Sequence, residues 1–141
     1  MTSLVIRNAS WVVTVGPERQ IIADGAVAIV NIATGLALRP AANYSSYIAS
    51  KSGLLALTKS LAIELAPTVR VNAVCPGAVD TPMTAELYRD EIRRSEAVSN
   101  YALKRLGTAP EVAQAVLFLT GSESGFITGV SLAVDGGRSF H

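Results

Sequence analysis

The pattern of hydrophobic and polar positions changes near residue 26. Before this point, short β-branched runs alternate with Gly, Pro and Asp, which is typical of strands joined by turns. The runs are Leu4–Arg7, Trp11–Val15 and Ile21–Ile22, with turn signals at Gly16-Pro17 and Asp24-Gly25. We predict three short antiparallel strands in this part of the chain.

After residue 26, apolar runs alternate with helical patterns. Ala26 to Ala33 is almost continuously apolar, as expected of a strand covered on both faces. Helical periodicity extends from Tyr44 to Ala66, and Pro67 ends it. The same alternation continues with a strand at Val69–Cys75, a polar helix from Thr84 to about Tyr101, a helix from Pro110 to Leu119 and a strand at Ile127–Val134. This order predicts an α/β fold with a parallel sheet and crossover helices.

Composition narrows the class of protein. Of the 141 residues, 50% are hydrophobic and 16% are charged, whereas an average soluble domain is about 25% charged. The mean hydropathy is +0.38. These values predict one domain with a substantial core and argue against disorder. No apolar run approaches the roughly 18 residues of a membrane span, so the apolar excess must lie in a doubly covered sheet or against a partner.

The charge and the content of cysteine and histidine exclude further classes of protein and of site. The net charge of +1 provides no electrostatic footprint for nucleic acid. The single cysteine, Cys75, excludes an internal disulfide and fits a reducing cytoplasm. We interpret it as a buried small hydrophobe. The N-terminus does not read as a signal peptide. Because the only histidine is His141, we expect no metal site built on imidazole.

Candidate chemistry centres on Tyr47 and Lys51, which are four residues apart on the predicted helix and so share a face. A lysine cation beside a phenol stabilises the phenolate, and such a phenol can exchange a proton with a carbonyl or alcohol oxygen. By itself this spacing is weak evidence, because most such pairs are surface residues. Thr34, just past an apolar strand, adds a hydroxyl that could hold a substrate oxygen.

Several motifs accompany this pair in a fixed order. They are Ile29-Val30-Asn31-Ile32, Tyr47-Ile48-Ala49-Ser50-Lys51, Val69-Arg70-Val71-Asn72-Ala73-Val74-Cys75-Pro76-Gly77, Arg105-Leu106-Gly107, Ile127-Thr128-Gly129 and Val134-Asp135-Gly136-Gly137. Together they resemble the short-chain dehydrogenase/reductase family over about residues 26–138.

The resemblance implies oxidoreductase ancestry with NAD or NADP as cofactor. Tyr47 would be the general acid/base, Lys51 would favour its phenolate form and bind the nicotinamide ribose, and Thr34 takes the place of the usual serine. The residues that would lie beside the nicotinamide are Pro76, Gly77, Val79 and Thr81.

The resemblance covers only the second half of the family's domain. Three features of the family's first half have no counterpart in this sequence. They are the Thr-Gly-x-x-x-Gly-x-Gly turn, the residue that selects NAD or NADP, and the Asn-Asn-Ala-Gly stretch. The nearest match, Thr120–Ile127, follows a helix rather than a strand, so we interpret it as the exit of that helix. We therefore expect a truncated Rossmann-like sheet of three family strands, with weak or absent cofactor binding because the affinity should be severely reduced. Oxidoreductase activity is therefore doubtful.

Residues 1–29 resemble the N-terminal strands of amidohydrolase-type enzymes. The matching stretches are Leu4–Ala9, Val12–Val15 and Ile21–Ile29. They bring no metal ligand, so amidohydrolase activity does not follow. The resemblance implies a chimera, with an N-terminal β segment at residues 1–25 and half of a dehydrogenase/reductase domain at residues 26–141.

A truncated sheet predicts association. The strand at Ala26–Ala33 would lose its neighbour, so the N-terminal strands or a second chain should cover its apolar edge. On the long helix, a stripe of small residues permits close approach of another helix, unless it packs under the sheet; the stripe is Ala49, Gly53, Ala56 and Ser60. We expect a homo-oligomer, at least a dimer, with no nucleic-acid or membrane partner.

Three functions remain open from the sequence. One is a short-chain oxidoreductase acting on a small molecule, with Tyr47 and Lys51 retained. Another is a promiscuous, esterase-like hydrolase in which Tyr47 attacks an activated ester beside Lys51 and Thr34. The third is a non-catalytic, oligomeric fusion product that folds because its strands and helices still bury one another.

Overall fold

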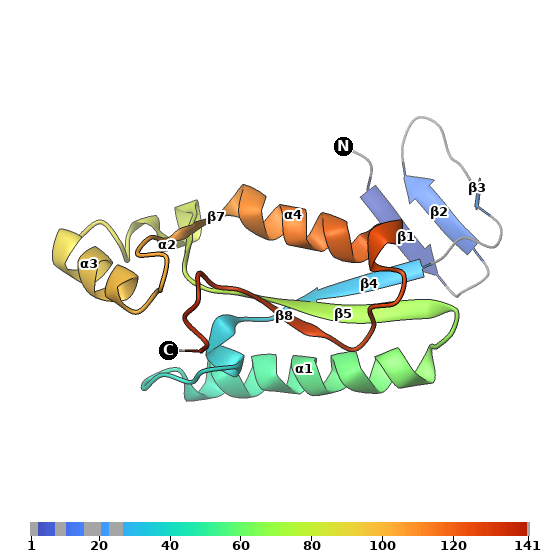
Figure 1. The fold of residues 1–141 in the computed structure, drawn as a ribbon, viewed down its shortest axis with the longest axis horizontal. Helices are drawn as coiled ribbons and strands as arrows, with labels where there is room; N and C mark the ends of the chain where they lie inside the picture. Colours follow the sequence, from blue (N-terminus) through green and yellow to red (C-terminus); the bar gives the residue numbers. More distant parts are fainter. Residues whose placement is uncertain (1–2, 8–10, 16–20, 23–26, 141) are drawn as a thin grey trace.

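A parallel sheet with one long helix on each face forms the centre of the molecule (Figure 1). The computed structural model describes residues 3–7, 11–15, 21–22 and 27–140. The strands of this sheet are β4 (Val27–Ile32), β5 (Val69–Pro76) and β8 (Ser131–Val134), all parallel and in the order β4-β5-β8. Helix α1 (Ser45–Glu64) covers one face and α4 (Ala109–Thr120) covers the other. The predicted α/β fold is confirmed.

A separate antiparallel sheet precedes this centre. Its strands are β1 (Ser3–Arg7), β2 (Trp11–Val15) and β3 (Ile21–Ile22), which confirms the three predicted strands. The turn signals at Gly16-Pro17 and Asp24-Gly25 lie outside the described residues.

The described N-terminal strands do not pair with the edge of β4, so this one of the two predicted ways of covering the edge is wrong. Covering by a second chain stays a prediction. They pair with one another and form a sheet of their own. Closing a short loop between neighbouring strands costs little conformational entropy, which favours this local pairing. Figure 1 places the sheet beyond the amino end of β4, away from its side. The outer edge of β4 therefore has no strand partner among the described elements.

Strand β5 is the most deeply buried element. Val71, Ala73, Val74 and Cys75 have no exposed surface. Alternate residues of β5 face α1, where Val71 packs with Ala62 and Cys75 packs near Leu55. Burial also raises the pKa of the Cys75 thiol. The interpretation of Cys75 as a small buried hydrophobe is confirmed.

Two polar side chains of β5 hold the segment that follows α4. The Arg70 guanidinium donates to the carbonyls of Leu119 and Gly121, at 2.9 and 3.2 Å. The fully buried Asn72 donates to the Ile127 carbonyl at 3.0 Å, and its Oδ1 accepts from the Val130 N–H at 3.1 Å. Gly121 follows the last residue of α4, so the interpretation of Thr120–Ile127 as a helix exit is confirmed.

The last strand is shorter than predicted. The structure assigns only Ser131–Val134 to β8, whereas the apolar pattern began at Ile127. Gly129 has a φ of +75°, outside the range of a strand. Its N–H nevertheless donates to the Val71 carbonyl at 2.8 Å, so this segment still lies against β5.

The predicted helix from Thr84 to Tyr101 is wrong as one element. It is divided into α2 (Pro82–Ala85) and α3 (Glu91–Ser99). Asp90 begins α3 because its carboxylate accepts from the N–H groups of Ile92 and Arg93, a role that favours a helix start over a helix interior. In the segment between α2 and α3, Arg89 forms an exposed ion pair with Glu86.

Four short elements were not predicted from the sequence. They are η1 (Gly35–Ala37), β6 (Val79–Asp80), β7 (Gly107–Thr108) and η2 (Ser122–Ser124). Each has only two or three residues, which is too short for a periodic pattern. Among the described residues, no helix is long and apolar enough to cross a membrane.

Replacement of Asn72 by Ala should destabilise the fold by about 1–3 kcal/mol, because the Val130 N–H loses its buried acceptor and the Ile127 carbonyl loses a donor. Urea denaturation measures the difference. Asn100→Ala is the matched control, since the Asn100 amide bonds the Glu96 carbonyl at an exposed position. Equal losses in the two variants would contradict the structural role of Asn72.

Candidate active site at the carboxyl edge of the sheet

A cavity of about 310 Å³ lies where β4 and β5 end. Thr34 follows β4, Pro76 and Gly77 lie at the end of β5, and Tyr47 comes from the first turn of α1; all four line the cavity. Open α/β sheets bind their ligands at the carboxyl ends of their strands. The fold thus brings four of the sequence-predicted site residues to the place where a ligand is expected.

Thr34 is a buried residue of this cavity wall. Its side chain is 8% exposed, and its hydroxyl accepts from the Leu36 N–H at 3.3 Å, which begins η1. A hydroxyl can accept and donate at once. Among the described residues nothing accepts the Thr34 hydroxyl proton, so this group can donate to a ligand oxygen.

Helix α1 is fixed to β4 at two points. The Asn31 amide donates to Thr58 Oγ1 at 2.9 Å, and Lys51 Nζ donates to the Ile32 carbonyl at 2.8 Å. Lys51 Nζ also lies 6.0 Å from the centroid of the Tyr47 ring, so the predicted proximity of the pair is confirmed. Tyr47 is 44% exposed and faces the cavity from its rim. Lys51 stands behind it and does not line the cavity.

The turn after β5 requires a glycine. A Cβ on Gly77 would lie 2.7 Å from Tyr101 Cε1 and 3.0 Å from Asp135 Cα, which leaves no room for a side chain. The Gly77 N–H donates to the Val134 carbonyl, and the Ala78 N–H donates to Tyr101 Oη at 2.8 Å. Tyr101, 6% exposed, therefore holds this turn in place.

Val79 and Thr81 do not line the cavity. Val79 belongs to β6, which pairs with β7 through Gly107. Thr81 begins α2 in a reciprocal capping arrangement with Thr84. In this structure the two residues organise the segment leading from the turn to α2.

Among the polar residues of the cavity wall that sequence reasoning missed are Tyr88 and Arg138. Burial raises the pKa of the Tyr88 phenol, Tyr101 and Tyr44 add to the rise, and the positive charge of Arg138 opposes it. No motif singled out either residue. Arg138 lies near the end of the chain, and only the path of the chain after β8 brings it to the site.

The chain was compared with family models, curated proteins and solved structures. A family model of the short-chain dehydrogenase/reductase type, described as enoyl-(acyl carrier protein) reductase, matches residues 8–139. The chain belongs to the short-chain dehydrogenase/reductase family. The match begins within the N-terminal segment that resembles amidohydrolases, and the findings give no evidence for that second resemblance.

Curated relatives and solved structures cover the same part of the chain. The 2-(R)-hydroxypropyl-CoM dehydrogenase of Xanthobacter autotrophicus is 40% identical over 80% of this chain and 46% of its own length. The 3-oxoacyl-[acyl-carrier-protein] reductase of Thermotoga maritima is 43% identical over 77% of this chain and 44% of its own. The chain thus spans about half the length of the curated relatives it matches.

The structural comparison gives the same extent. Ligand-free aldohexose dehydrogenase of Thermoplasma acidophilum matches with a TM-score of 0.76 and 42% identity, over 83% of this chain and 50% of that one. A putative 2-deoxy-D-gluconate 3-dehydrogenase of Agrobacterium tumefaciens with bound NADP matches with a TM-score of 0.77 and 34% identity, over 82% and 47% of the two chains.

The described residues fit only the nicotinamide side of a dinucleotide cofactor. Pro76 and Gly77 line the cavity, and Lys51 is held at the end of β4 by its hydrogen bond to the Ile32 carbonyl. The volume of the cavity, about 310 Å³, is at the low end of the roughly 300–1,000 Å³ that is typical of small-molecule pockets. No strand in the described part of the chain leads through a glycine-rich turn into a helix start that could hold phosphates. Nor is any group of three His, Cys, Asp or Glu side chains gathered there as for a metal ion.

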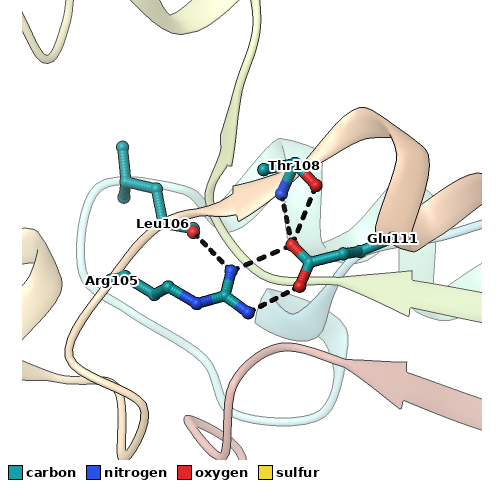
Figure 2. A network of polar contacts seen from close by, with 4 residues as sticks. All are labelled: Arg105, Leu106, Thr108 and Glu111. Carbon is teal, nitrogen blue, oxygen red and sulfur yellow. Dashed lines mark hydrogen bonds and ion pairs between the residues drawn. The ribbon is translucent and has the colours of Figure 1, made fainter.

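A second cavity of about 300 Å³ shares Tyr101 and Ala78 with the first and is bordered by a charged network. Figure 2 shows how Arg105, Thr108 and Glu111 come together where β7 leads into α4. The Arg105 guanidinium donates to both oxygens of Glu111, at 2.9 and 2.5 Å. The N–H and hydroxyl of Thr108 donate to the same carboxylate at 2.8 and 2.9 Å, forming the cap of α4.

This network makes the stability of the fold depend on pH. The hydrogen bonds from Arg105 and Thr108 lower the pKa of Glu111 from 4.5 to about 2. The stabilisation is therefore fully present above about pH 4.5 and is lost as the pH falls towards 2. NMR titration of the Glu111 carboxyl carbon should give a midpoint near 2. Glu111→Gln should reduce the loss of stability between these pH values, with the exposed Glu96→Gln as the charge-matched control. A midpoint near 4.5 would contradict the network.

Proposed function

We propose that the chain carries the substrate-binding and proton-transfer half of a short-chain dehydrogenase/reductase site. One observation carries the proposal: Thr34 and Tyr47 line the same cavity, and the Lys51 cation is tethered beside Tyr47. A buried hydroxyl donor and a phenol supported by a cation suit proton exchange at a carbonyl or alcohol oxygen.

In the proposed reaction, an alcohol loses a hydride from its carbinol carbon and a proton from its hydroxyl to become a carbonyl compound; reduction is the reverse. Thr34 donates a hydrogen bond to the substrate oxygen, and Tyr47 Oη takes or returns the proton. Lys51 stabilises the phenolate through its positive charge. A nicotinamide cofactor, when bound, accepts or supplies the hydride, which no side chain here can do.

The described residues supply little of the cofactor site. Lys51 donates one N–H to the Ile32 carbonyl, and an ammonium has two others that could reach a ribose hydroxyl. Pro76 and Gly77 would lie against the nicotinamide. Residues to hold the phosphates, or to choose between NAD and NADP, are not identified in the chain. We therefore expect NAD(P) to bind weakly.

Two measurements test the oxidoreductase proposal. Titration with NADH or NADPH, followed by cofactor fluorescence, should show weak but saturable binding that Tyr47→Phe leaves unchanged. Tyr47→Phe should lower turnover by about 10²–10⁴-fold, because the phenylalanine ring cannot exchange a proton. Absence of binding at millimolar cofactor would refute the proposal, and equal turnover of variant and parent would remove Tyr47 from it.

A second candidate function is ester hydrolysis, favoured by the exposure of Tyr47 to solvent at the cavity rim. Tyr47 Oη would attack the ester carbonyl, the alkoxide or phenolate would leave, and water would then release the acid from the tyrosyl ester. A panel of nitrophenyl esters with the Tyr47→Phe variant decides this alternative, since equal rates in variant and parent would exclude it.

We also propose that the chain associates through α1. The stripe of small residues faces away from the sheet: Ala49, Gly53, Ala56 and Ser60 are exposed, whereas Leu55, Thr58 and Ala62 are buried. No atom lies within 4 Å of the position that a Cβ on Gly53 would occupy. Such a surface allows another helix to approach closely, which supports a homo-oligomer, with or without catalysis.

Ala56→Arg should shift the protein towards monomer, because a long charged side chain would stand at the centre of the stripe. Size-exclusion chromatography with light scattering measures the mass. Ser95→Arg, on the exposed surface of α3, is the control and should leave the mass unchanged. A parent protein that is already a stable monomer would contradict the association.

The chimeric origin of the N-terminal segment stays a prediction. Its antiparallel strands form a sheet separate from β4, which is compatible with a foreign segment. The family match that begins at residue 8 argues for a chain continuous with the family.

A further inference from the structure

Arg138 is the one cationic residue among the described residues that line the candidate site cavity. It extends from the segment after β8 to the cavity that Thr34 and Tyr47 line from the side of β4 and α1. No Asp or Glu belongs to the described lining. Among these described lining residues, the positive charge of Arg138 has no negative counterpart.

The position of Arg138 is fixed by a reciprocal contact. Its Nη1 donates to the Arg39 carbonyl at 3.0 Å, and Arg39 Nη1 donates to the Arg138 carbonyl at 2.9 Å. Two residues that are 99 apart in the sequence are thereby joined across the site. Within the described part of the chain, the Arg39 carbonyl is the only acceptor of the Arg138 guanidinium. A guanidinium has five N–H donors, so several remain for a ligand.

The charge of Arg138 is not neutralised by the protein residues described. The ion pairs present among them are Arg89 with Glu86 and Arg105 with Glu111. Its field reaches the cavity wall, where it opposes the burial that raises the pKa of Tyr88. A partly buried cation is stabilised by an anionic partner, and the planar fork of a guanidinium matches a carboxylate through two parallel hydrogen bonds.

We propose that Arg138 binds a carboxylate of the substrate, so that the site takes small hydroxy acids or oxo acids. This inference rests on the proposed function for the reacting end, whose oxygen would lie at Thr34 and Tyr47. Leu87 and Ala97 also line the cavity, so their apolar side chains are available to contact the carbon chain between the two ends. The cavity of about 310 Å³ suits a molecule of this size.

Ligand binding without cofactor tests the inference. The probes are levulinate, an oxo acid, and levulinamide, which has the same carbon skeleton without the charge. Titration by saturation-transfer-difference NMR should show levulinate binding about tenfold more tightly than levulinamide, the size expected of one charge-assisted contact. Arg138→Gln should remove most of this difference and leave the affinity for levulinamide unchanged. Arg138→Lys should retain part of it, because it keeps the charge but not the planar fork.

The control variant is Arg94→Gln, which removes the same charge from an exposed position on α3 and should change neither affinity. Thermal unfolding of each variant shows whether loss of the contact with Arg39 has altered the fold. If Arg138→Gln weakens both probes equally, its role is structural and the inference is wrong. Equal affinity of the parent for the two probes, or no detectable binding of either, also overturns it.

The outcome is separable from that of the oxidoreductase test. A preference for levulinate that depends on Arg138 would stand even if NADH and NADPH failed to bind, and would then describe an anion site without the proposed reaction. Turnover of neutral alcohols with no preference for levulinate would support the reaction and refute the role of Arg138.

Discussion

The structure depends on the complete burial of β5. A strand in this position must find hydrogen-bond partners on both edges and apolar neighbours on both faces, because water cannot reach its polar groups. β4 and β8 satisfy its edges, α1 and α4 cover its faces, and Arg70 and Asn72 extend the polar contacts to the segment after α4. Every element of the central sheet is placed by one of these requirements.

The candidate site follows from this arrangement. Because β4 and β5 are parallel, their carboxyl ends meet at one edge, and α1 returns from that edge with Tyr47 in its first turn. The bond from Lys51 to the Ile32 carbonyl then ties the helix to the strand end. The same order of elements that completes the core thus brings a hydroxyl, a phenol and a cation together at the carboxyl edge of the sheet.

The unpaired outer edge of β4 bears on how much of the proposed site this chain contains. The chain matches just under half the length of its curated relatives, and the edge of β4 has no strand partner among the described elements. The residues proposed for proton transfer therefore lie together in the described structure, whereas residues for the cofactor phosphates are not identified in it. The exposed stripe on α1 lies on the opposite side of that helix from the sheet, so association through it would leave the cavity open.

The sequence by itself determined the strands, the long helices and the Tyr47–Lys51 pair, because hydrophobic period and local spacing are properties of neighbouring residues. It did not determine where the polar stretch before Tyr101 breaks, because Asp90 can stand inside a helix or, as here, cap the start of one. Nor did it determine that the last strand begins only after Gly129. No sequence pattern indicated that Arg138 and Tyr88 belong to the site. They reach the cavity through contacts between residues far apart in the chain, such as Arg39 with Arg138, and only the packed tertiary structure creates those contacts.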